Sequence, residues 1–440
     1  MTSAASRLMQ QMLLDARSRT LMLASDLTAS QLLGPRLKIV NPPLWEIGHL
    51  AWFQERWCLR QTDHDSELLA SIYSDADRLY DSSTVAHDIR WDLPLPTLET
   101  TLDYLSTVLD RVLERLAATP TGSFLYFTQL AALHEEMHCE AFTYTRQTLG
   151  YSRPPTGAAP PPIGETSSRG DAAIPGGTFM LGATRDAGFV FDNEKWAHPV
   201  RVEPFSISKT CVTNGEFMAF VEDAGYSRRE LWSLEGWQWR VAAGASQPVY
   251  WRKSDGFWQM RVYDEWQPIS MHAAVVHVNA YEADAYCRWA GRRLPSEPEW
   301  EYAASVEAHS LSHKRRYPWG DEPPDCGRAN LYGSSDHAAD VAAFPRGDSA
   351  WGCRQMIGNV WEWTADTFTP YPGFVADPYQ DYSEPWFGDH TVLRGGCFAT
   401  RAHLIHNTWR NFYTADRRDV FAGFRTCAAK RSVSAADHIG

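Results

Sequence analysis

Hydrophobic positions recur with a helical period in the first part of the chain. Along residues 5–27, and again along residues 97–118, apolar side chains are spaced three or four positions apart. This spacing is typical of helices that bury one face. Two further helices are expected, one with Asn41 as N-cap before two prolines, and one over residues 123–150, from a serine cap to a terminating glycine. Four such helices predict an antiparallel bundle.

A polar stretch and a linker interrupt this pattern. Residues 62–92 are rich in acidic and serine side chains, so a long loop is expected there. Residues 151–172, YSRPPTGAAPPPIGETSSRGDA, have the Pro, Gly and Ser content of a linker. The sequence therefore predicts a helical domain over residues 1–150, a linker over residues 151–172 and a second domain over residues 173–430.

Short strands follow the linker, in segments such as IPGGTFMLGAT and VRVEPFSISKTCVT. Two compact helices are predicted among them. One has Asn279 and Glu282 as a capping box, and the other has Ser296 and Glu299. The remainder is rich in Trp and Gly and is expected to form turns. A helical bundle followed by such a domain predicts the α+β class.

Composition and charge exclude several classes of protein. With 44% hydrophobic and 22% charged residues, the chain is folded rather than disordered. Its formal net charge of −13 argues against nucleic acid or an anionic membrane as the main partner. The N-terminal residues lack the apolar core of a signal peptide, and no stretch approaches about 18 consecutive apolar residues. A cytoplasmic protein without membrane spans is therefore expected.

Cysteine and aromatic residues are numerous. The eight cysteines have no C-x-x-C spacing, which in a reducing compartment predicts free thiols. The 19 Trp, 18 Tyr and 19 Phe are expected mainly to pack a loop-rich domain. Neither feature by itself identifies a reaction.

The segment HEEMHCEAF, residues 134–142, contains the strongest candidate metal ligands. His134 and His138 are four positions apart, so both lie on one face of a helix and can bind the same ion. That face is expected to point into the bundle, where His49 is the best third ligand. Three neutral imidazoles suit zinc hydrolysis and iron(II) dioxygen chemistry equally, so the ligand set leaves the metal open.

The same segment matches the zinc-protease pattern H-E-x-x-H, in which Glu135 would be the general base. The continuation CEAFTYTRQTLG lacks the glycine and the histidine of the extended pattern. The protease interpretation is weakened accordingly, and Glu135 is expected to support a ligand or to lie on the surface.

The second domain resembles the formylglycine-generating-enzyme-like (sulfatase-modifying) fold, a C-type-lectin-like domain. The segments GRRLPSEPEWEYAA, YPWGD, IGNVWEWTAD and VLRGGCFATR occur in the order found in that fold, over roughly residues 173–430. The first 150 residues, with His49 and the HxxxH helix, resemble a bundle of the DinB type. Together the two domains resemble the ergothioneine sulfoxide synthases and their relative, selenoneine synthase.

This resemblance implies an iron(II) enzyme whose active site lies between the domains. His49, His134 and His138 match the ligands of Fe(2+), which in that family binds hercynine (trimethylhistidine) and a sulfur or selenium donor. Dioxygen then drives C–S or C–Se bond formation at the imidazole. Tyr379 matches the tyrosine that serves the family as a proton donor, and Tyr382 lies near it in the sequence.

Two departures from the family pattern bear on the donor. Met137 stands where a glutamine contacts the imidazole in the actinobacterial form, and Tyr413 replaces an aspartate that helps to bind γ-glutamylcysteine. A pocket without that carboxylate fits cysteine or a selenosugar. The run RNFYTADRRDVFAGFRTC is similar to the selenoneine branch. The resemblance thus favours a selenosugar donor, with cysteine or γ-glutamylcysteine as the alternative.

The other residues expected to bind substrate are Arg90, Asn411, Phe412, Tyr413 and Arg417. Arginine binds carboxylates and other acidic groups as a planar fork, which suits the acceptor or the donor. Arg394 and Arg425 are expected instead to form ion pairs that stabilise the fold.

Two other classes of function stay open. A sulfatase-activating oxidase would bind copper through two cysteines shortly after R-G-G, whereas this chain has Thr400 and Ile405 there. A non-catalytic pair of binding modules would bind no metal tightly. Tight metal binding therefore separates the enzyme classes from the binding module.

Overall fold

The computed structural model describes residues 4–61, 68–118, 120, 122–164, 169–307 and 310–429. Two compact units divide the chain: unit 1 comprises Met1–Gly157 with Tyr263–Glu265, and unit 2 comprises the rest. The division falls within the segment predicted to be a linker, whose residues 165–168 lie outside the described part. The predicted end of the second domain, at residue 430, also lies outside it.

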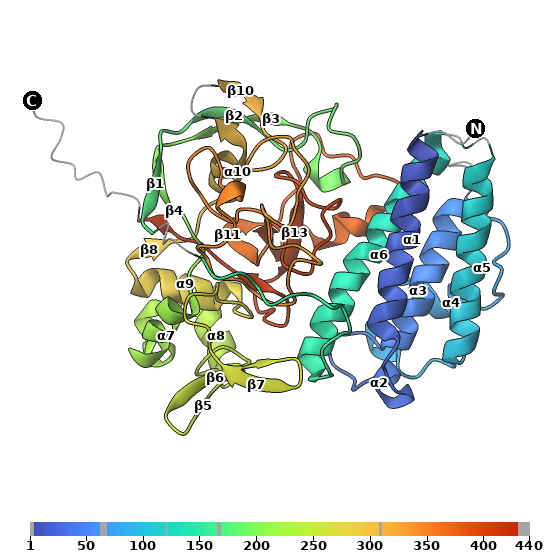
Figure 1. Cartoon of the computed structure of the whole chain (residues 1–440), viewed down its shortest axis with the longest axis horizontal. Coiled ribbons are helices and arrows are strands. Elements are labelled where there is room, and N and C mark those ends of the chain that lie inside the picture. The colour runs from blue at the N-terminus through green and yellow to red at the C-terminus, as the bar shows by residue number, and fades with distance from the viewer. Residues whose placement is uncertain are drawn as a thin grey trace, which may run out of the picture. The chain divides into compact units, whose positions relative to one another are not determined.

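Unit 1 is built from long helices. Its α-helices are α1 (Ala4–Ala24), α2 (Ala29–Leu33), α3 (Pro43–Glu55), α4 (Ala76–Tyr80), α5 (Leu98–Ala117) and α6 (Gly122–Leu149). Helix α1 packs against α6, and α3 packs against both α5 and α6, as the blue and teal ribbons of Figure 1 show. Their apolar faces meet in the interior, where Leu13, Val108 and Ala132 have no exposed surface. The predicted helical bundle is confirmed.

Three local predictions for unit 1 are wrong. Asn41 does not cap α3: the N-cap residue is Pro42, and the amide oxygen of Asn41 accepts a hydrogen bond from Arg90 (2.6 Å) instead. Ser123 lies inside the first turn of α6 rather than before it. The short helix α4 forms within the stretch 62–92 that is expected to be a loop, of which residues 62–67 lie outside the described part. At Asn41, a tertiary hydrogen bond has displaced a local cap.

Unit 2 contains shorter helices. These are α7 (Asn214–Glu222), α8 (Leu234–Ala242), α9 (Ala280–Trp289) and α10 (Glu297–Ser305). Both predicted capping boxes are confirmed, because the Asn279 and Ser296 side chains accept hydrogen bonds from the backbone N–H groups of Glu282 and Glu299. Helices α7 and α8 were not predicted, although α7 also begins with a capping box, at Thr213.

Fifteen short strands accompany these helices in the described residues. They are β1 (Asp171–Ile174), β2 (Gly177–Leu181), β3 (His198–Val202), β4 (Phe205–Ser208), β5 (Trp251–Ser254), β6 (Phe257–Val262), β7 (Glu265–Pro268), β8 (Arg292–Arg293), β9 (Val306–Glu307), β10 (Ser310–Lys314), β11 (Trp361–Thr367), β12 (His390–Arg394), β13 (Arg410–Thr414), β14 (Ala422–Gly423) and β15 (Cys427–Ala428). None is longer than seven residues, so loops carry much of the unit.

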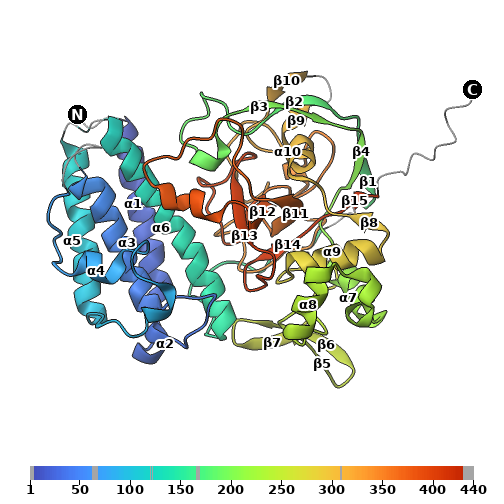
Figure 2. The same cartoon turned by 180° about the vertical axis from the view of Figure 1, so that it is seen from behind.

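Two four-stranded sheets organise unit 2. One has the strand order β13-β12-β11-β14, with only the β11 and β14 pair parallel, and Figure 2 shows its strands side by side. The other sheet has the strand order β1-β4-β15-β8, so it contains both the first and the last strand of the unit. In this sheet, Cys427 of β15 lies opposite Ile207 of β4.

The prediction of turns in the last part of unit 2 is wrong, because strands β11 to β15 lie there. In β11, Trp361, Glu362 and Trp363 are all buried. Both faces of this strand are therefore covered, and the two-residue alternation that marks a half-exposed strand is absent from its sequence.

Buried ion pairs hold the loops of unit 2 together. Arg394 and Arg410 both donate to the carboxylate of Glu297, at 2.8 and 2.7 Å. Arg425 donates to Glu362 at 2.6 Å. The side chains of these three arginines have no exposed surface. The expectation that Arg394 and Arg425 form ion pairs that stabilise the fold is confirmed.

All eight cysteines are free thiols, and seven of them are buried, which confirms the prediction from their spacing. No disulfide therefore constrains this fold, and packing and buried polar pairs stabilise it instead. Among the described residues, no helix is long and apolar enough to cross a membrane.

Replacing Arg425 with Met is expected to lower the free energy of unfolding by about 3–5 kcal/mol, because the buried Glu362 carboxylate then keeps only uncharged donors, the Trp300 indole and the Cys211 thiol. Urea unfolding followed by the loss of near-ultraviolet circular dichroism measures the change. The double variant E362Q/R425M removes both charges and should recover most of the loss. An equal loss in the single and double variants would contradict this role of the ion pair.

Candidate metal centre

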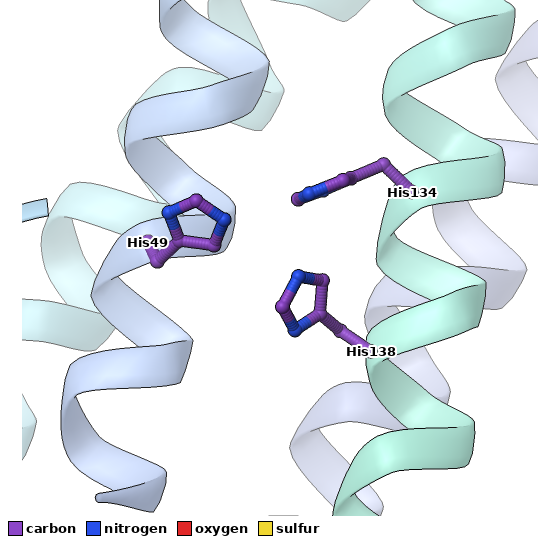
Figure 3. Close-up of side chains that lie close together, drawn as sticks. All are labelled: His49, His134 and His138. Carbon is purple, nitrogen blue, oxygen red and sulfur yellow. The ribbon is translucent and has the colours of Figure 1, made fainter. Parts of the chain in front are cut away.

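Three histidine side chains of unit 1 converge between two helices. His49 comes from α3, and His134 and His138 come from successive turns of α6. One ring nitrogen of each histidine lies within 4.8 Å of the other two. Figure 3 shows the three rings facing a common point between the helices. The structure thus brings together the three residues predicted to bind a metal.

The end of α4 orients the imidazole of His49. Its Nδ1 lies 2.8 Å from the carbonyl oxygen of Tyr80, which can only accept, so Nδ1 carries the proton and Nε2 presents a lone pair. The preceding residue, Gly48, makes this contact possible. A Cβ at Gly48 would lie 2.3 Å from atoms of the Tyr80 ring. Glycine at this position therefore lets α4 approach the histidine closely.

A carboxylate orients the imidazole of His138. The Nδ1 of His138 lies 2.5 Å from Oε1 of Glu46, a residue of α3 with only 1% of its surface exposed. When an acceptor holds Nδ1–H, the other nitrogen, Nε2, is the one available to a metal.

The third imidazole is held by an aromatic face. The ring of His134 stacks on Phe53 with centroids 3.6 Å apart and planes 7° apart. Burial, together with the neighbouring imidazoles, holds the pKa values of His49 and His134 well below the usual value. Both rings are neutral at neutral pH, and the neutral imidazole is the form that binds metals.

These features fit a transition metal ion. In His49 and His138, Nδ1 contacts a hydrogen-bond acceptor, which leaves Nε2 available to a metal. This is the common arrangement of metal-binding histidines. Three protein ligands leave further coordination positions for substrates. Imidazole binds zinc, iron and copper alike, so the ligand set alone does not choose the metal.

Arg90 lies beside the histidines, next to a tryptophan. The ring of Trp45 stacks on His49 with centroids 5.0 Å apart, and the guanidinium carbon of Arg90 lies 3.9 Å from the centroid of Trp45. Burial lowers the pKa of Arg90 to about 10, which leaves it charged at neutral pH. Of the predicted substrate residues, Arg90 and the half-buried Met137 lie in the same unit as the histidines.

Glu135 points away from the three histidines. Its carboxylate accepts from Arg17 of α1 at 2.9 and 3.2 Å and from the hydroxyl of Thr20 at 2.8 Å. The residue is 2% exposed. The expectation of a supporting or surface role is therefore wrong, because Glu135 forms a buried ion pair with α1. Its carboxylate is also not placed to act as a hydrolytic base at the histidines.

Glu46, Phe53 and Gly48 are functional residues that the sequence patterns did not predict. Glu46 lies three residues before His49, so helical geometry places the two side chains on one face. That spacing was a usable signal. The roles of Phe53 and Gly48 depend on contacts with α6 and α4, and no local pattern marks them.

The predicted catalytic tyrosine lies in unit 2. Tyr379 precedes a 3₁₀ turn, Gln380–Tyr382, and its ring lies 6.3 Å from that of Tyr382. Tyr382 stacks on Phe191 with centroids 4.3 Å apart, and its hydroxyl accepts from Trp409 at 3.3 Å. Burial, with the charges of nearby carboxylates, holds the pKa of Tyr382 well above its usual value. This phenol stays protonated.

Hydrogen bonds fasten the loop that carries both tyrosines. Asp192 accepts from the hydroxyl of Ser383 and from the backbone N–H of Asp377. The ammonium group of Lys195 lies 2.6 Å from the carboxylate of Asp377. Each end of the segment 377–383 is therefore tied to residues 192–195, which restricts where Tyr379 can move.

Strand β13 carries the other predicted substrate residues. Successive side chains of a strand point to opposite faces, so Asn411 and Tyr413 lie on one face and Phe412 on the other. Phe412 stacks on Phe368, with centroids 4.1 Å apart. A ligand on one face of β13 can therefore contact either the side chains of Asn411 and Tyr413 or the side chain of Phe412, but not both.

Arg417 follows this strand and already has a charged partner. Two of its nitrogens donate to the carboxylate of Asp419 at 2.6 and 2.7 Å. Its guanidinium carbon lies 4.9 Å from the centroid of Tyr413.

The expectation of an active site between the two domains stays a prediction.

Comparison with protein families identifies two regions. Residues 158–430 match the model of the sulfatase-modifying factor enzyme 1-like domain, and residues 12–141 match the DinB superfamily. The predicted fold class, a DinB-like bundle followed by a formylglycine-generating-enzyme-like domain, is confirmed.

Curated relatives match either nearly the whole chain or about 60% of it. Hercynine oxygenase of Mycolicibacterium thermoresistibile is 36% identical over 421 residues, which cover 94% of this chain and 93% of that protein. Hercynine oxygenase of Mycobacterium tuberculosis is 37% identical over 413 residues, 93% of this chain and 96% of that protein. The formylglycine-generating enzyme of Streptomyces coelicolor is 33% identical over 300 residues, 60% of this chain and 88% of that protein.

Replacing Glu135 with Gln is expected to leave metal binding nearly unchanged, because Glu135 contacts α1 and not the histidines. The affinity for Co(II), measured by visible absorption titration, should stay within about threefold, or under 1 kcal/mol. The free energy of unfolding should fall by about 1–3 kcal/mol, because buried Arg17 loses a charged partner. A drop of tenfold or more in Co(II) affinity with the fold intact would assign Glu135 to the metal centre.

Proposed function

Since the chain belongs to the family of the hercynine oxygenases, we propose that it is an iron(II)- and dioxygen-dependent enzyme that joins the imidazole of hercynine to a selenium or sulfur donor. The observation that carries the proposal is the convergence of His49, His134 and His138. In the balanced reaction, the imidazole loses a C–H hydrogen and the donor loses its Se–H or S–H hydrogen. Dioxygen takes up four electrons, with one oxygen atom leaving as water and the other bonded to selenium or sulfur.

The metal would be held by the three neutral imidazoles. Bound iron(II) supplies the site at which dioxygen is reduced and substrates are held close together. The chain's own contribution is to fix the ligands, through Tyr80 for His49, Glu46 for His138 and Phe53 for His134. Ligands with fixed partners lose little conformational entropy on binding, which favours tight binding of the ion.

Arg90 is the best candidate to bind the carboxylate of hercynine. It lies against Trp45, which stacks on His49. The Nε–H of Arg90 is buried and has no hydrogen-bond partner among the described residues, so one donor of the fork stays available. An acceptor that carries a carboxylate would satisfy this group.

Contacts of Tyr413 and Arg417 support a selenosugar as the donor. The Asp419 carboxylate already neutralises Arg417, so this arginine offers little attraction to the carboxylates of γ-glutamylcysteine. Tyr413 offers an aromatic face, and no carboxylate stands in its place to bind an amino group. An uncharged sugar needs neither ionic partner. Cysteine and γ-glutamylcysteine are the alternative donors, and they define an ergothioneine-type sulfoxide synthase.

The match to formylglycine-generating enzymes does not favour a sulfatase-activating oxidase. That match covers only the second part of the chain, while the hercynine oxygenases match both parts. Thr400 also stands where a copper-binding cysteine is needed, and its hydroxyl accepts a hydrogen bond from the backbone N–H of Cys397 (2.9 Å).

The proposed function is tested by supplying Fe(II), hercynine and dioxygen with a selenosugar, cysteine or γ-glutamylcysteine in parallel. Product masses and initial rates are recorded. The selenosugar should be coupled at least about tenfold faster than either thiol, a difference of about 1.4 kcal/mol. Faster coupling of a thiol would make the enzyme an ergothioneine-type synthase. Absence of any hercynine adduct from an iron-loaded enzyme would overturn the proposal. The variant His138→Ala, which should lose iron and product together, is the control.

Replacing Tyr379 with Phe is expected to slow coupling by about 100-fold or more, because the phenol is proposed to supply a proton during dioxygen reduction. A larger share of the consumed dioxygen should then oxidise the donor alone. The ratio of coupled product to oxidised donor measures this change. Tyr371→Phe is the matched control, since that hydroxyl lies 3.3 Å from the buried Glu297. An unchanged ratio in Tyr379→Phe would remove Tyr379 from the mechanism.

A further inference from the structure

A buried carboxylate links the two helices that carry the histidines. Glu46 is on α3, one turn before His49, yet its carboxylate contacts His138 of α6 at 2.5 Å. Its side chain is 2% exposed, and that of His138 is 19% exposed. A buried carboxylate is costly unless it is paired, so this contact is a specific one.

The three imidazoles differ in the group that contacts each ring. His49 has a neutral backbone carbonyl, His138 has a carboxylate and His134 stacks on the ring of Phe53. A carboxylate that accepts from Nδ1–H makes the opposite nitrogen a stronger electron donor than a neutral carbonyl does. Of the two histidines with a defined Nδ1 acceptor, His138 is therefore the stronger donor.

We propose that Glu46 is a positioning residue that aims Nε2 of His138 at the metal and, through its charge, raises the electron density at the iron. This inference rests on the proposed iron centre. It goes beyond the ligand set, because it assigns to one residue on α3 both the geometry of a ligand on α6 and the electronic difference between His138 and His49.

The positive charge of Arg90 lies near the negative charge of Glu46 and partly balances it. Burial lowers the pKa of Arg90 to about 10, and the nearby charge of Glu46 acts in the opposite direction. The guanidinium also lies over Trp45, whose ring stacks on His49. Arg90 and Glu46 together therefore border two of the three ligands, and the negative charge near His138 has a cation within reach.

The conservative variant Glu46→Gln separates charge from geometry. A glutamine has the same shape, and its amide oxygen can still accept from Nδ1–H, so the tautomer of His138 is kept while the charge is lost. The variant Glu46→Leu removes both. Glu55→Gln is the matched control, because Glu55 is on the same helix and is also 1% exposed, but bonds to Tyr104 and Ile72 instead of a histidine.

Three readouts on the full chain test the role of Glu46, namely the Fe(II) affinity, the Co(II) spectrum and the Fe(III)/Fe(II) midpoint potential. Anaerobic titration gives the affinity for Fe(II), and the visible spectrum of the Co(II)-loaded protein reports the ligand field. Glu46→Leu should weaken Fe(II) binding by about 10–100-fold and change the Co(II) spectrum. Glu46→Gln should weaken binding less, and should move the Fe(III)/Fe(II) midpoint potential to more positive values, because the negative charge that favours the more highly charged ion is gone. Glu55→Gln should change none of these.

The inference is overturned if both Glu46 variants bind Fe(II) within about threefold of the wild type and have its Co(II) spectrum. A purely structural role would lower the unfolding temperature without changing the spectrum of the fully loaded protein, and that result also overturns it. The measurement needs no turnover. If the wild type binds Fe(II) tightly but couples no donor to hercynine, the proposed reaction fails while the role of Glu46 can still be decided.

Discussion

The packing of α6 between α1 and α3 is the constraint on which unit 1 depends. One face of α6 directs His134 and His138 toward α3, and another directs Glu135 toward Arg17 of α1. The groups on both faces are buried or nearly so, and each is costly to leave unpaired. A rotation of α6 about its axis would break both sets of contacts at once. The ion pair with α1 and the cluster of three histidines therefore lie on different faces of α6 and are both satisfied by the same rotation of this helix.

Unit 2 solves a different problem, since its strands are short and loops carry many of its residues. Arg394 and Arg410 share the carboxylate of Glu297, and so bring β12, β13 and α10 together at one buried point. Guanidinium groups suit this task because their five donors lie in a fixed plane and can bind several loops simultaneously. The segment 377–383 is held without a guanidinium group, by hydrogen bonds to the carboxylate of Asp192 and an ion pair between Lys195 and Asp377. Polar pairs thus add to the apolar core of unit 2, which includes Phe179, Ile207 and Trp300.

Local signals in the sequence were enough to predict the long helices, the capping boxes at Asn279 and Ser296, and the three histidines. The helices, the capping boxes and the pair His134 and His138 depend on residues within one or two helical turns, whereas His49 was predicted because the bundle needs a third ligand. Strand β11 was missed because burial on both faces removes the alternation that identifies a strand. The partners of the histidines were missed for another reason. Tyr80 and Phe53 act through a carbonyl and a ring face, which any residue or any aromatic residue provides, so their identity alone carries no signal.

The residues proposed for the metal and for the donor lie on different kinds of structure. The metal ligands are on helices, and at least two are locked by hydrogen bonds, so a change there costs stability as well as metal binding. Tyr413 and Arg417 lie on a sheet-edge strand and in the segment after it. Selenolates and thiolates are both soft nucleophiles and need the same oxidation by dioxygen. The proposed change of donor therefore involves Met137 of unit 1 as well as Tyr413 and Arg417 of unit 2, and it leaves the proposed ligands His49, His134 and His138 in place.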